Sequence, residues 1–261
     1  MSDDNQMMTF GGHLEVLRRM LFRILIVAAI LAVMIFCFKD WTFSMLLAPS
    51  ESDFCLYRWI ESFFALVGYD FRFTNFEVDL IATDLSSQFM THISTSLYLG
   101  LLSASPYILF ELFRFISPAL YDNERRYSIP FLLTIYALFV IGVLMSYYIL
   151  FPISFRFLGT YSVAAKVHST ITLDSYVSTF VTLTLVMGVI FQLPVVAFLL
   201  AKLGIIESAM LAKYRRHALL IIMIVAAIIT PPDLMTLVLV TIPLYVLYEI
   251  SIVVARRVEK R

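Results

Sequence analysis

Carboxylates and arginines gather in two polar segments of an otherwise apolar chain. Near its start, "GGHLEVLRRM" places Glu15 one helical turn before Arg18 and Arg19. Further along, "FRFISPALYDNERRY" places Glu124 directly before two arginines. Carboxylates accept paired hydrogen bonds from guanidinium groups, so both segments could bind a positively charged peptide. The alternative is membrane anchoring with local ion pairs, which contribute little stability when exposed.

An amide side chain lies inside a third, strongly apolar segment. Gln192 occurs in "GVIFQLPVV", two residues before Pro194. Proline lacks an amide donor, which frees the carbonyl of Ile190 and predicts a kink. The Gln192 amide could satisfy that backbone, or it could face a polar ligand or a partner helix. The residues alone leave both roles open.

Two prolines and a carboxylate interrupt the last long apolar stretch, in "AAIITPPDLM". Pro231 and Pro232 are expected to end a helix. Asp233 would be costly at the centre of a bilayer, but it is well placed to cap the next helix by accepting from its free amides. The pattern predicts a tight hairpin, with Asp233 structural first and a partner contact second.

Familiar catalytic patterns are missing from the sequence. It has no zinc-protease, nucleophile-elbow or phosphate-loop motif, and its four histidines lack metal-ligand spacing. We therefore expect no enzyme, cofactor or metal. The formal net charge of zero argues against a nucleic-acid partner. The two cysteines, Cys37 and Cys55, are expected to be separate thiols rather than a disulfide.

The composition indicates a membrane protein. Hydrophobic residues make up 61% of the 261, charged residues only 15%, and mean hydropathy is +0.90. A spanning helix needs about 20 mostly apolar residues. We predict an all-α polytopic fold with six spans, in one transmembrane domain covering residues 1–261. The expected spans are 20–38, 88–111, 128–151, 176–201, 217–230 and 234–251. The polar N-terminus shows no cleavable signal peptide, so the first span is expected to remain as an anchor.

The last two predicted spans are short. Residues 217–230 would form a helix about 21 Å long, against a hydrocarbon core of about 30 Å. Such a helix must thin the bilayer or end below its surface. Between the first two spans, the loop 39–85 contains "LYRWIESFFALVGYDF". This segment could be an interfacial helix or an ordered cap on the helical bundle, and both remain open.

The distribution of basic residues sets the expected orientation. Most lysines and arginines fall in the two tails and the even-numbered loops. Because positively charged loops stay in the cytoplasm, both termini are predicted to be cytoplasmic.

Several motifs together resemble a known family. In order they are "HLEVLRRML", "FRFISPALYDNERR", "GVIFQLPVV", "LGI", "KYRRHALLIIMIVAAIITPPD" and "IPLYVLYEI". From about residue 10 to 252 the chain resembles TatC, the multispanning subunit of the twin-arginine protein translocase. The resemblance implies a receptor in the bacterial cytoplasmic (inner) membrane that binds twin-arginine signal peptides of folded proteins. It also implies TatA- or TatB-type single-span partners, self-association and transport driven by the proton-motive force.

The resemblance further implies which residues contact the signal peptide. Glu124 matches the acidic residue of the first cytoplasmic loop and is the best candidate to pair with the substrate's arginines. Phe115 and Pro118 match the pattern that shapes this loop, and Arg18 matches the arginine of the N-terminal motif.

The sequence departs from the family's pattern at two positions. Val16 stands where the family has a glutamate, and Glu15 lies one residue earlier, about 100° away on a helix. Gln192 stands where the family often has a glutamate. A neutral amide cannot titrate, so Gln192 is expected to contact a partner helix or the signal peptide rather than to relay protons.

Two alternative functions would use other residues of the chain. A small secondary transporter could use Gln192 and the hydroxyls of span 88–111 as a solute site, but no inverted repeat is evident. An intramembrane hydrolase would need a nucleophile and a base at one depth, and His92, the histidine within a span, has no evident partner.

Overall fold

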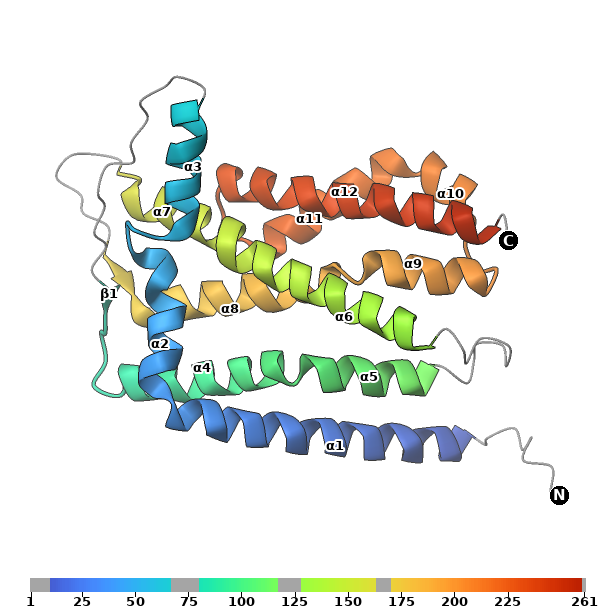
Figure 1. The fold of residues 1–261 in the computed structure, drawn as a ribbon, viewed down its shortest axis with the longest axis horizontal. Helices are drawn as coiled ribbons and strands as arrows, with labels where there is room; N and C mark the ends of the chain where they lie inside the picture. The colour runs from blue at the N-terminus through green and yellow to red at the C-terminus, as the bar shows by residue number, and fades with distance from the viewer. Residues whose placement is uncertain (1–9, 67–79, 117–127, 163–169, 260–261) are drawn as a thin grey trace. The chain divides into compact units, whose positions relative to one another are not determined.

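The computed structural model describes residues 10–66, 80–116, 128–162 and 170–259, which are almost entirely helical (Figure 1). The chain divides into two compact units. The first contains residues 1–39 and 92–136, and the second contains residues 40–91 and 137–261.

Three helices form most of the first unit: α1 (Phe10–Cys37), α4 (Ser87–Ser103) and α5 (Ser105–Ile116). In Figure 1, α1 runs alongside both others. The approach of α1 to α4 depends on Gly100, because a Cβ atom there would lie 2.7 Å from the backbone of Ala32. One residue before the end of α1, Phe36 stacks on His92 with ring centroids 4.1 Å apart.

The second predicted span is broken rather than straight. Helices α4 and α5 meet at a bend of 50°, which corrects the expectation of one helix over 88–111. Pro106, in the first turn of α5, has no amide to donate to the preceding turn. A bend at a proline is therefore expected, but hydropathy does not report it.

The second unit contains the remaining helices and one very short sheet. Strands β1 (Leu80–Ile81) and β2 (Ile171–Thr172) pair in parallel. The elements of its first half are α2 (Lys39–Leu47), the 3₁₀ turn η1 (Ala48–Ser50), α3 (Cys55–Leu66), α6 (Ser128–Met145), which begins in the first unit, η4 (Ser146–Leu150) and α7 (Phe151–Thr160). Those of its second half are α8 (Leu173–Ile190), α9 (Leu193–Lys202), α10 (Ser208–Lys213), α11 (Arg215–Ile229) and α12 (Leu234–Glu259).

The third predicted span is longer than expected. Its helical run extends over Ile129–Thr160, 32 residues, whereas the sequence predicted an end at residue 151. The run passes through η4, a π-helical turn that ends two residues before Pro152. The widened turn admits a proline where a regular turn would need its amide, so the helix continues.

Tyrosine hydroxyls hold the last turn of α2 against other helices of the second unit. Tyr147 donates to the carbonyl of Met45 and Tyr176 to that of Leu46, each at 2.8 Å. These carbonyls belong to the last turn of α2, where a helix leaves its carbonyls without intrahelical partners. Buried tyrosines therefore satisfy backbone groups that water cannot reach.

Helix α3 is partly a cap on the bundle. Its Tyr57 is buried and donates to the carbonyl of Pro152 at 3.0 Å, whereas Trp59 is 68% exposed. The prediction of an ordered cap therefore holds for the face of α3 that carries Tyr57. The face that carries Trp59 is exposed and could lie in the membrane interface, as the other alternative predicts. The end of the quoted segment, from residue 67, lies outside the described residues.

Cys55, at the start of α3, and Cys37 are both free thiols, as predicted.

Helices α11 and α12 differ in length from each other. Helix α11 has 15 residues, which confirms a short fifth helix. Helix α12 has 26 residues and continues to Glu259, which corrects both the predicted end at residue 251 and the expectation that the sixth span is short. Pro243 lies inside α12 without ending it.

Four described helical runs are long and apolar enough to cross a membrane, and the bent α4–α5 pair would make a fifth. These four runs are Leu14–Cys37, Ile129–Thr160, Leu173–Lys202 and Leu234–Glu259. The chain is a multi-pass membrane protein of all-α class.

Candidate functional site

The carboxylate of Glu15 is bound by its own helix. It accepts from Arg18 Nη2 and from Arg19 Nε, both at 2.9 Å. These partners lie three and four residues later, the spacing at which side chains meet on a helix surface. All three side chains are exposed, so the contacts contribute little stability and a competing guanidinium could replace them.

A cavity of about 140 Å³ lies between α1 and α5 in the first unit. It is lined by Val16, Met20, Arg23, Glu111, Arg114 and Phe115. The Val16 position, at which the family pattern has a glutamate, thus faces the neighbouring helix. This chain instead supplies a carboxylate to the cavity from α5.

That carboxylate, on Glu111, is buried and held by two donors. Tyr107 donates to Oε1 at 2.9 Å, and Arg23 donates to Oε2 at 3.1 Å. A buried carboxylate is costly unless it is paired and hydrogen-bonded, and here it is both. This pair was not predicted from the sequence. Two lone opposite charges at the ends of neighbouring apolar runs could have indicated it.

Of the residues predicted to shape the loop after α5, the structure describes only Phe115. Phe115 is half-buried at the cavity, near the end of α5. Glu124 and Pro118 lie outside the described residues, and their assignment stays a prediction.

Gln192 lies at the predicted break in the fourth span. Helix α8 ends at Ile190 and α9 begins at Leu193, which confirms an interruption before Pro194. The Gln192 carbonyl accepts from the amides of Val195 and Val196, at 2.9 and 3.0 Å. Its backbone therefore starts α9, while its half-buried side chain makes no capping bond to that helix.

The "TPPD" segment forms the predicted hairpin tip. The Asp233 amide donates to the Pro231 carbonyl at 2.7 Å. Oδ1 of Asp233 accepts from the Thr236 amide at 2.6 Å, which confirms that this residue caps α12. Its Oδ2 is buried and accepts no hydrogen bond among the residues that the structure describes. Pro232 is exposed.

Beside this hairpin lies a larger cavity of about 410 Å³. Hydroxyl-bearing residues of α8 line much of it, together with Thr230 and Pro231. Pro231 thus contributes both to the turn and to a polar hollow in the second unit.

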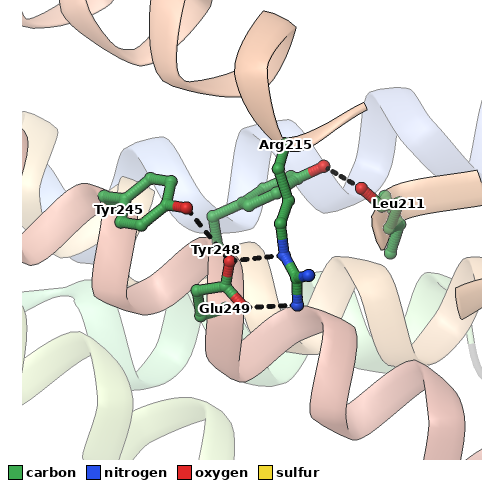
Figure 2. A network of polar contacts seen from close by, with 5 residues as sticks. All are labelled: Leu211, Arg215, Tyr245, Tyr248 and Glu249. Atoms are coloured by element: carbon green, nitrogen blue, oxygen red, sulfur yellow. Dashed lines mark hydrogen bonds and ion pairs between the residues drawn. The ribbon is translucent and has the colours of Figure 1, made fainter. Parts of the chain in front are cut away.

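A polar network at the other end of α11 joins that helix to α12 (Figure 2). Nε and Nη2 of Arg215 donate to the two carboxylate oxygens of Glu249, at 2.7 and 2.9 Å. Tyr245 donates to the same carboxylate, and Tyr248 donates to the Leu211 carbonyl. The hydrogen bonds that Arg215 donates to Glu249 raise the pKa of Arg215, so its guanidinium group stays charged.

The extension of α12 makes a second contact with the segment before α11. Glu259 accepts from the backbone amide and the hydroxyl of Ser208, the first residue of α10. Residues 208–215 are thus held against α12 at both ends, through Ser208 and through Arg215. The described residues contain no group of three or more side chains that could hold a metal ion.

Comparison with known proteins places this arrangement in a family. The model for TatC, Sec-independent protein translocase protein, matches residues 12–243. The chain belongs to the TatC family. TatC proteins are translocase components and not a family of catalytic enzymes, which argues against the hydrolase alternative.

Individual TatC proteins are similar over almost their whole length. A TatC of Blattabacterium is 32% identical over 265 residues, covering 100% of both chains. A TatC of Deinococcus radiodurans is 34% identical and covers 94% of this chain and 84% of its own length. A crystal structure of the twin-arginine translocase receptor TatC aligns with a TM-score of 0.75, at 33% identity, over 95% of this chain and 99% of its own.

Proposed function

We propose that this chain is the twin-arginine signal-peptide receptor of a Tat translocase. It binds signal peptides of folded proteins at the cytoplasmic face and nucleates a complex with TatA- or TatB-type partners and further copies of itself. Transport is driven by the proton-motive force. The TatC family match over residues 12–243 is the observation that carries this proposal.

The docking step is assigned to the carboxylates near the first cytoplasmic loop. Glu124 binds the substrate's guanidinium groups, because planar carboxylates and guanidiniums form paired hydrogen bonds. Glu15 contributes only when a substrate arginine displaces Arg18 and Arg19, its present partners. Phe115 and Pro118 shape the loop, and Arg18 lies exposed on α1 beside Glu15.

The apolar part of the signal peptide then inserts along the bundle near Gln192. A half-buried amide at a helix break offers hydrogen bonds at membrane depth without carrying charge. This supports contact with a partner helix or with the signal peptide over proton relay. The short helix α11 spans about 22 Å, so it favours local thinning of the bilayer around the assembled complex.

The protein is placed in the bacterial inner membrane with both termini in the cytoplasm. The support is the concentration of lysine and arginine in the tails and even-numbered loops.

The docking step is tested by reversing one charge. In Glu124→Arg, photocrosslinking of a twin-arginine signal peptide to the chain should fall at least tenfold, since an attractive contact becomes repulsive. Glu207→Arg is the matched control, because Glu207 is an exposed carboxylate before α10. That variant should crosslink as the unmodified chain does. Unchanged crosslinking in Glu124→Arg would refute the assignment of this residue.

A further inference from the structure

We propose that the cavity between α1 and α5 binds the phosphate of an anionic phospholipid headgroup. Its volume of about 140 Å³ suffices for a phosphate group, since one water molecule takes about 30 Å³ of liquid. Apolar side chains line the rest of the cavity, on Val16, Met20 and Phe115.

The charges around the cavity favour an anion. Among the described residues that line the cavity, two arginines, Arg23 and Arg114, accompany one carboxylate, Glu111, so positive charge is in excess. Glu111 already accepts from Tyr107 and Arg23. A further cation there would add to the excess and be repelled.

Both arginines have guanidinium N–H groups that donate to no residue in these contacts. Arg23 gives one nitrogen to Glu111, and Arg114 has no ion-pair partner in the part of the chain that the structure describes. Guanidinium groups bind phosphate oxygens through several N–H donors at once. One anion could therefore bridge Arg23 and Arg114 and neutralise the surplus charge.

The position of the cavity along the helices selects a lipid as the source of the phosphate. Arg23 lies near the start of the first predicted span, and Arg114 lies just beyond the end of the second. Both guanidiniums are thus at the depth of lipid headgroups, where basic pockets between helices bind anionic lipids. Neighbouring Phe22 and Leu112 are exposed and apolar, which suits contact with acyl chains.

The test is native mass spectrometry of the purified full-length chain, titrated with phosphatidylglycerol and with phosphatidylcholine. The unmodified chain should prefer phosphatidylglycerol. Arg114→Gln should lower that preference about fivefold, the factor that corresponds to about 1 kcal/mol per arginine near a charged membrane. Arg114 is exposed and has no ion-pair partner among the described residues, so the substitution should not disturb folding.

Two further variants sharpen the result. Val16→Glu places a second carboxylate in the cavity and should lower the preference as Arg114→Gln does. Arg257→Gln removes an exposed arginine in the last turn of α12 and should change the preference less than twofold.

Three outcomes would overturn the proposal. The first is an unchanged lipid preference in Arg114→Gln. The second is loss of bound phosphatidylglycerol on addition of excess inorganic phosphate, which would make free anion the ligand. The third is tighter binding of a twin-arginine peptide in Arg114→Gln with lipid binding unaltered, which would make this a peptide site. Lipid is measured without substrate, so failure here leaves the receptor proposal intact.

Discussion

Glu15 and Glu111 are carboxylates of neighbouring helices, and their surroundings give them different roles. Glu15 is exposed and forms ion pairs with two arginines of its own helix. Glu111 is buried and depends on Tyr107 and Arg23 for its hydrogen bonds. An exchangeable contact suits ligand binding, whereas a buried pair fixes the geometry of the cavity that it lines.

Asp233 offers a test at the scale of a single residue. Asp233→Ala removes the oxygen that caps α12 and should lower the free energy of unfolding by about 1 kcal/mol. Asp233→Asn keeps an acceptor at the same place and should lose much less. Both are measured by thermal unfolding in detergent. Equal losses in the two variants would show that the charge, and not the cap, is what stabilises the hairpin.

At the scale of the helix, a glycine controls how closely α1 and α4 pack. Gly100→Ala would place a Cβ atom 2.7 Å from the Ala32 backbone, which cannot move aside as a flexible side chain could. Overpacking of this kind costs about 1–3 kcal/mol. The control is Gly11→Ala, because a Cβ atom there meets nothing within 4 Å. Thermal unfolding should separate the two variants, and equal midpoints would contradict the close packing.

Hydropathy predicted where the helices lie but not how they bend or end. The apolar runs located five of the six helical segments to within a few residues at their starts. The bend before Pro106 and the π-helical turn before Pro152 were missed, because a proline can kink, end or be absorbed by a helix. The length of α12 was missed because its last turns carry Arg256, Arg257 and Glu259, which resemble a tail until Ser208 is seen to bind Glu259.

The sequence likewise predicted the local features of the candidate site but not its long-range contacts. Local chemistry was sufficient for the cap by Asp233 and for the break at Gln192, because each depends on residues adjacent in the sequence. The pair of Arg23 and Glu111 joins residues 88 positions apart, so only the packing of α1 on α5 reveals it. Val16 was identified as a departure from the family, and the structure adds that it lines the cavity.

At the scale of the whole molecule, the chain is too small to enclose a path for a folded protein. Buried aromatic side chains fill the space between the helices of the second unit. We therefore propose that partner subunits supply the opening and that this chain supplies recognition of the substrate.

The most direct test of that claim is co-purification of the full-length chain with a twin-arginine substrate and with the same substrate carrying two lysines. Lysine keeps the charge but cannot form the paired hydrogen bonds that guanidinium groups form with a carboxylate. The twin-arginine substrate should therefore be recovered at least tenfold more efficiently than the twin-lysine substrate. Equal recovery of the two substrates would contradict recognition by this chain.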